Sequence, residues 1–341
     1  MSTPAIAAHR PTWAWLREPR FDIAFILGLP AMALLTGVVV LAQPSLFPVV
    51  LLFDLWVLGY HHVISTYTRL LFDAKSRAEH RDLIVSLPLA VALATILAVA
   101  VFGLWIVVSV YFYWQWFHYT RQSWGISRAY RAKDRDALFE DGWLDTAIFY
   151  ALPVAGIVHR SAQGAETFLG LPLRSIPIPA VVDQAVLAGA IGLMLVWLVR
   201  RVQALREGRL ANAHTLYMLS HFTMFAVGYL VIADISYGWL TINIWHNAQY
   251  ILFVWMFNTR RFKDGVDPES PVLSWLSQPG RLGLYLAFCL VLTGVLYWGV
   301  IGTIDGLLFT GLAGTVVLFQ ILNFHHYVVD SRIWKVRAAP I

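Results

Sequence analysis

The sequence has a single cysteine, Cys289, among 341 residues. One cysteine excludes an intrachain disulfide and a cysteine-ligated metal cluster. Charged residues are also scarce, at 13% of the chain, whereas soluble domains carry roughly 25%. Hydrophobic residues make up 59%. A soluble core could not absorb this much apolar surface, so the composition indicates a membrane protein.

Nucleotide-binding motifs are missing as well. There is no P-loop, no Gly-rich dinucleotide motif and no low-complexity tail. The formal net charge of +5 could suggest a nucleic-acid partner. The basic residues, however, stand in small groups between apolar runs, which is the pattern of membrane topology. We therefore expect no nucleic-acid partner.

Apolar runs of the length that crosses a bilayer, about 20 residues, recur along the whole chain. Lipid offers no water to backbone groups, so each run is expected to be a helix. The first run is too long for a signal-peptide core and is interpreted as a retained helix. The predicted spans are 21–42, 47–69, 83–102, 104–127, 144–159, 179–199, 212–233, 239–259, 282–301 and 306–329.

These spans predict an all-α fold, a polytopic integral membrane helical bundle of about 10 transmembrane helices in one domain, 1–341. Residues 83–127 could also form one broken helix near Gly103. With a cytoplasmic N-terminus, every Lys and Arg except Arg160 and Arg174 falls in a cytoplasmic segment or span end. Cytoplasmic loops carry such an excess. We therefore predict cytoplasmic N- and C-termini and the bacterial inner membrane as the location.

Eleven histidines are present. His9, His80 and His159 fall in loops or at a span end, whereas the others lie within spans. At 1.5 Å per residue, His246 lies near mid-bilayer and His214 near the cytoplasmic entrance of its helix. A common depth of roughly 10–15 Å inside the cytoplasmic edge is predicted for the remaining ones. These are His61, His62, His118, His221, His325 and His326.

Ionisable side chains inside a bilayer are costly and usually face the bundle interior. One such histidine would most simply form a hydrogen bond between helices. So many at one depth, on several helices, instead favour a metal site. The predicted metal ligands are His61, His62, His118, His221, His246, His325 and His326, with Asp54, Asp330 and His214 as further candidates.

Iron, copper and zinc all accept neutral imidazole ligands. Soluble di-iron proteins rely mainly on Glu, but no Glu lies inside any predicted span. An iron site here would therefore be rich in histidine. Gln115 and Gln122 flank His118 at helical spacing, and Asp330 follows His326 by one turn. Such groups can orient imidazole ligands, or they can simply join helices.

Aromatic residues crowd the segment Tyr111–Tyr119, which is interrupted only by Gln115 and His118. These rings could line a pocket for an apolar or polyene substrate. The alternative is the aromatic belt that membrane proteins carry at the lipid–water interface.

The pairs His61-His62 and His325-His326, with single histidines on other helices, complete the layout. In this layout the chain resembles the membrane non-haem iron oxygenases: alkane hydroxylases, fatty-acid desaturases and sterol-type hydroxylases. It also resembles the bacterial Brp/Blh carotene-cleaving enzymes. Neither pair has the upstream histidine of the hydroxylase–desaturase histidine boxes. The resemblance implies an O2-dependent oxygenase, hydroxylase or desaturase that acts on a lipid or isoprenoid.

Such an enzyme would hold iron, expected as two ions, although copper or zinc would suit the same ligands. A cytoplasmic reductase or ferredoxin would supply electrons, whereas a carbon–carbon-cleaving dioxygenase would need no donor. Two other functions stay open. Histidines on different helices could ligate haem b in an electron-transfer protein. They could also relay protons or metal ions in a transporter, although the outer half of the spans has acidic groups only near its ends, at Asp183, Asp234 and Asp305.

Overall fold

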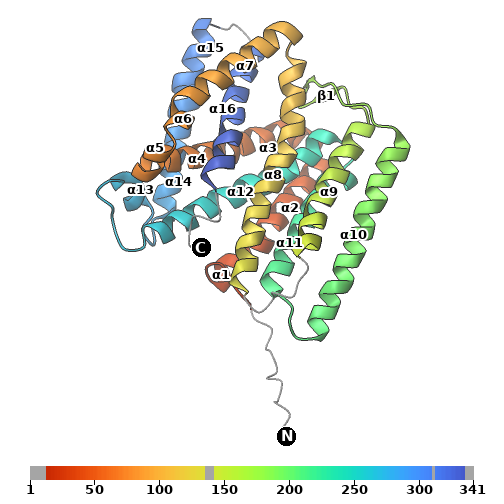
Figure 1. Ribbon diagram of the computed structural model, residues 1–341. Coiled ribbons are helices and arrows are strands. Elements are labelled where there is room, and N and C mark those ends of the chain that lie inside the picture. Colours follow the sequence, from red (N-terminus) through yellow and green to blue (C-terminus); the bar gives the residue numbers. More distant parts are fainter. Residues whose placement is uncertain (1–12, 135–141, 309–311, 335–341) are drawn as a thin grey trace.

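The computed structural model describes residues 13–134, 142–308 and 312–334. Helices dominate these residues (Figure 1), which confirms the predicted all-α class. Strands β1 (Thr167–Phe168) and β2 (Leu171–Pro172) form one small antiparallel hairpin in the long loop before α10 (Ala180–Arg206). His9 lies outside the described residues.

Each predicted span falls largely on a helical segment, with residues 309–311 outside the described part of the chain. The first segments are α1 (Pro19–Ile23), η1 (Ala24–Gly28), α2 (Leu29–Ala42), η2 (Pro44–Leu46), α3 (Phe47–Phe53), η3 (Asp54–Gly59), α4 (Tyr60–Phe72), α5 (Ala74–Glu79), α6 (Arg81–Ile84), α7 (Ser86–Phe102) and α8 (Trp105–Lys133). After these come α9 (Gly142–Ala162), α10, α11 (Asn212–Ala226), η5 (Val227–Val231), α12 (Ile235–Arg261), α13 (Pro271–Leu276), α14 (Leu282–Thr293), η6 (Gly294–Ile301), α15 (Gly302–Leu308) and α16 (Leu312–Ile333).

Within the described residues, four helical stretches are long and apolar enough to cross a membrane, by length and composition. They are Pro19–Ala42, Pro44–Phe72, Ala180–Arg206 and Leu282–Leu307. The most apolar window of α10 is only 11% buried, so its aliphatic side chains face outward. Soluble monomers rarely expose apolar patches of this extent. A lipid environment would cover them.

Gly103 separates α7 from α8. Its backbone has φ 87°, a conformation that residues with a side chain rarely adopt. Helix α7 therefore ends at Phe102 and α8 begins at Trp105. Residues 83–127 thus contain two main helices, with the break where the sequence suggested it.

Helix α12 lies at the centre of the bundle (Figure 1, teal), and its residues 238–251 are all buried. It approaches η5 so closely that a Cβ atom on Gly238 would clash with the carbonyl oxygen of Gly228. The buried guanidinium of Arg160 donates to carbonyl groups of Gly228, Ile232 and Ala233 at the end of η5. These contacts fix one end of α12 and therefore help to position the histidine on it.

Candidate metal centre

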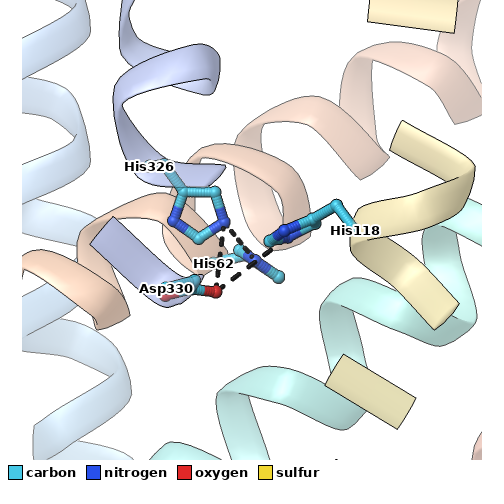
Figure 2. A group of neighbouring side chains, drawn as sticks. All are labelled: His62, His118, His326 and Asp330. Atoms are coloured by element: carbon cyan, nitrogen blue, oxygen red, sulfur yellow. Dashed lines mark hydrogen bonds and ion pairs between the residues drawn. The ribbon is translucent and has the colours of Figure 1, made fainter. Parts of the chain in front are cut away.

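Three histidines and one aspartate converge between α4, α8 and α16 (Figure 2). The ligand atoms of His62, His118, His326 and Asp330 all lie within 4.8 Å of one another, and all four residues are buried. The residues come from positions far apart in the sequence, so only the packing of the helices brings them together. Among the described residues this is the group whose geometry suits a metal ion.

The distances within this group are short. The Nε2 atoms of His62 and His326 are 2.8 Å apart, and the Asp330 Oδ2 atom lies 3.6 Å from His326 Nε2 and 3.9 Å from His118 Nε2. Two ligand atoms on opposite sides of an ion with ~2.1 Å bonds are about 4.2 Å apart. Small side-chain shifts would therefore let all four residues bind one ion.

The hydrogen-bonding state of the group also fits a metal. The buried Nε2 atoms of His118 and His246 have no hydrogen-bond partner among the described residues, although buried polar groups are normally bonded. The Nε2 atoms of His62 and His326 face each other, and a metal ion could accept a lone pair from each. Three imidazoles with one carboxylate suit zinc or iron chemistry.

His246 on α12 lies directly beside the group. Its ring centroid is 4.8 Å from that of His62 and 5.3 Å from that of His118. On its other side the ring contacts Tyr119 at 4.0 Å. The sequence placed His246 deeper than the other histidines, yet the packing makes it their neighbour. This position would allow it to serve as a further ligand.

The same four-residue spacing recurs on the helices α4, α8, α12 and α16. Each carries a histidine and, four residues later, a polar side chain at or around Asp330. The pairs are His62 and Thr66 on α4, His118 and Gln122 on α8, His246 and Tyr250 on α12, and His326 and Asp330 on α16. Four residues is about one helical turn, so both members of each pair lie on one face.

Asp330 accepts hydrogen bonds from the second members of the other three pairs. Its Oδ1 atom accepts hydrogen bonds from the Thr66 hydroxyl at 2.9 Å and the Tyr250 hydroxyl at 2.8 Å. Its Oδ2 atom accepts one from the Gln122 amide and faces His118 and His326. The Oδ1 bonds orient the carboxylate so that Oδ2 points into the histidine group. Thr66 and Tyr250 were not predicted from the sequence, although their spacing from His62 and His246 carried the signal.

In each histidine pair, only the second member belongs to the group. His61 Nδ1 lies 3.2 Å from the carbonyl oxygen of Val57. Both ring nitrogens of His325 have partners 2.8 Å away, the Tyr67 hydroxyl and the Leu83 carbonyl oxygen. Neighbouring residues of an α-helix point about 100° apart, so two adjacent histidines face different surroundings.

Two predicted ligands lie on α11, in a different part of the bundle. His221 has both ring nitrogens in hydrogen bonds, with the Ser123 hydroxyl at 3.0 Å and the Phe149 carbonyl oxygen at 3.2 Å. Its ring stacks on Phe149 at 3.7 Å. His214 Nε2 lies 3.0 Å from the Ser127 hydroxyl. The structure does not bring either residue to the candidate metal group, which consists of His62, His118, His326 and Asp330 and is called the metal group below.

Asp54, another predicted candidate, lies in η3. It is buried, and its Oδ2 atom accepts a 2.5 Å hydrogen bond from the Asn243 side-chain amide. The Tyr119 hydroxyl donates to the other end of that amide. Asp54 therefore joins η3 to α12 and α8, and the structure does not place it among the four converging residues.

A cavity of about 590 Å³ adjoins the group and reaches His118 and Asp330. This volume lies in the range of small-molecule sites. Much of its wall is aromatic, formed by Trp114, Phe117, Phe253, Phe257, Tyr327 and Trp334. Trp114 and Phe117 belong to the aromatic run that the sequence suggested as a pocket lining. The arrangement combines a possible ligand set for a metal with a largely aromatic cavity beside it.

Comparison with known proteins gives no further assignment, because no family model, no curated protein and no solved structure matches the chain.

Proposed function

We propose that the chain is a membrane-embedded metal enzyme in which His62, His118, His326 and Asp330 hold a metal ion. The observation that carries this proposal is the convergence of four buried ligand atoms within 4.8 Å. The adjoining aromatic cavity supplies a place for a substrate. Polar groups buried in a membrane are costly, so their collection at one point favours a functional role.

Non-haem iron is the proposed metal, with copper and zinc as alternatives for the same ligands. When bound, iron would supply the activation of O2 for a hydroxylation, a desaturation or a carbon–carbon cleavage. Asp330 would hold its Oδ2 atom toward the ion through its bonds to Thr66 and Tyr250. A second ion, as in the di-iron expectation, would need His246 as a ligand.

The proposed substrate is a lipid or an isoprenoid. Aromatic walls suit an apolar body and exclude water from the reacting position. Hydroxylation or desaturation would take two electrons from the substrate and two from an external donor for each O2, so we propose a cytoplasmic reductase or ferredoxin as donor. A dioxygenase that inserts both oxygen atoms would need no donor.

We also propose about ten transmembrane spans with both termini in the cytoplasm, in a bacterial inner membrane. Support comes from the helical segments that coincide with the predicted spans and from the sorting of Lys and Arg. Under this topology the metal group lies toward the cytoplasmic side, within reach of an electron donor.

Haem b is less well supported than a non-haem ion. A haem with two axial histidines needs them on opposite faces of a wide, flat ring. Here the Nε2 atoms of His62 and His326 are 2.8 Å apart, and Asp330 and His118 occupy the space around them. An intense Soret band in purified protein would nevertheless contradict the non-haem proposal.

Metal analysis of detergent-purified protein, together with its optical spectrum, tests the proposal. The first prediction compares His62→Ala with His61→Ala. Loss of a ligand should remove most of the metal from the His62 variant, because fewer ligand atoms then remain at the centre. The His61 variant should keep wild-type metal content. Metal-free wild-type protein, or equal metal content in the two variants, would contradict the proposed site.

A further inference from the structure

The cavity beside the metal group has two chemically different ends. His118 and Asp330 lie at one end, and the lining also includes Arg69, Arg121 and Arg128. At 1.5 Å per residue, Arg69 lies about 10 Å along α4 from His62, and Arg128 about 15 Å along α8 from His118. Among the described lining residues, Asp330 is the sole acid, so the end away from the metal group is cationic.

Arg69 is held in place at this cationic end. Its Cζ atom lies 4.0 Å from the ring centroid of Phe257 and 4.1 Å from that of Trp334. Both rings also line the cavity. The buried Nη1 atom of Arg69 has no hydrogen-bond partner among the described residues. Leaving a buried charged donor without an acceptor is costly, and an anionic oxygen in the cavity would satisfy it.

We propose that the cavity binds an amphipathic lipid whose carboxylate or phosphate is held by Arg69, while its apolar body extends along the aromatic walls toward His118. A guanidinium matches both kinds of anion through paired hydrogen bonds. The exposed Arg128 adds positive potential at the same end, and the exposed Arg121 lies between it and His118. This inference deepens the proposed function: it selects anionic lipids over uncharged isoprenoids and places the reacting carbon roughly 10 Å from the head group.

Fluorescence titration of the full-length protein in neutral detergent tests the proposal. The probes are cis-parinaric acid and its uncharged methyl ester. The acid should bind about tenfold tighter than the ester, as expected for a charge-assisted hydrogen bond. Arg69→Gln should remove this preference and leave the affinity for the ester unchanged. Arg206→Gln, on the exposed end of α10, should keep it. Equal affinity of wild-type protein for acid and ester would overturn the proposal.

Competition experiments identify the head group and guard against a variant that fails to fold. Displacement of the probe by oleate alone assigns a carboxylate, displacement by lysophosphatidic acid alone assigns a phosphate, and displacement by neither overturns the proposal. Oleyl alcohol, which lacks a charge, should compete more weakly than oleate. Arg69→Lys should retain part of the preference, since it keeps the charge but loses the planar fork.

The inference rests on the proposed function only for the reaction at the metal end. The same titration with His62→Ala should therefore show the acid preference even when metal is lost. A metal-loaded wild-type protein without acid preference would contradict the lipid proposal and leave the metal site intact. A metal-free wild-type protein that prefers the acid would contradict the proposed metal site and leave the lipid proposal intact.

Discussion

Two buried histidines, His118 in the metal group and His221 on α11, differ in hydrogen bonding much more than in burial. His118 is 5% exposed and His221 is 0% exposed. Both ring nitrogens of His221 have partners, whereas Nε2 of His118 has none among the described residues. Burial therefore does not distinguish a structural histidine from a ligand. The feature that separates His118 from His221 is a buried nitrogen without a hydrogen-bond partner that lies close to other possible ligand atoms.

Two buried aspartates, Asp330 in the metal group and Asp145 on α9, also differ in their hydrogen-bond partners. Asp145 is paired with Arg201 at 2.5 Å and Arg131 at 3.0 Å. Asp330, in contrast, accepts its hydrogen bonds from the neutral side chains of Thr66, Tyr250 and Gln122. A buried carboxylate is normally paired with a cation or bound to a metal. Under the proposed function, a metal ion would supply positive charge at Asp330.

The largest effect is expected from replacing each of these two aspartates with asparagine. Asp330→Asn removes the charge at the proposed ion, so metal affinity should fall by more than the ~10–100-fold effect of losing an outer hydrogen-bond partner. Asp145→Asn should lower stability by roughly 3 kcal/mol, because it removes the ion pairs with the buried Arg201 and the half-buried Arg131. Its folded fraction should still bind metal. Metal content per folded protein, after gel filtration in detergent, measures the first effect, and thermal unfolding measures the second.

Equal metal content in the two aspartate variants would remove the basis of the comparison. Asp330 would then be a structural carboxylate like Asp145, and its neutral partners would need another explanation.

A smaller effect is expected from His221→Ala. The change removes two hydrogen bonds and the stacking on Phe149, and it leaves a cavity, so the free energy of unfolding should fall by roughly 2–4 kcal/mol. Metal content should not change, because His221 lies outside the group. Thermal unfolding and metal analysis of the same sample test this. A variant that is as stable as wild type but has lost metal would make His221 a ligand after all.

The sequence contained enough information for the helices, and three of the histidines that it predicted at one depth, His62, His118 and His326, do come together. Hydropathy and length located the helical segments, and Gly103 marked the break between α7 and α8. Depth was informative because a helix rises by a fixed distance per residue. It did not reveal which direction each side chain faces. His61 and His62 share a depth, yet only His62 joins the metal group.

His246 shows the second limit of depth counting. Its predicted depth assumed a helix perpendicular to the membrane, whereas a tilted helix uses more residues to cross the same distance. In the structure its ring lies 4.8 Å from that of His62. Thr66 and Tyr250 were missed for another reason. Thr and Tyr are common in membrane helices, and only the packing of α4 and α12 against α16 brings these two hydroxyls to Asp330.

The smallest of the predicted effects concerns Tyr250, and it tests whether the carboxylate is oriented by its neighbours. The Tyr250 hydroxyl donates to Asp330, contacts Thr66 at 2.6 Å and accepts from Trp334 at 2.9 Å. Tyr250→Phe removes these bonds but keeps the ring that stacks on His62 at 4.1 Å. Metal affinity should fall about tenfold and the free energy of unfolding by about 1 kcal/mol.

Tyr297→Phe is the matched control for this variant. The Tyr297 hydroxyl is also buried but has no hydrogen-bond partner among the described residues, and its ring stacks on Tyr60 at 3.9 Å. Removing that hydroxyl should change neither metal affinity nor stability measurably. Competition with a metal chelator, followed for both variants, gives the two affinities. If Tyr250→Phe behaved like Tyr297→Phe, the Oδ1 hydrogen bonds would not orient Asp330, and the four-residue spacing shared by the helices would reflect packing alone.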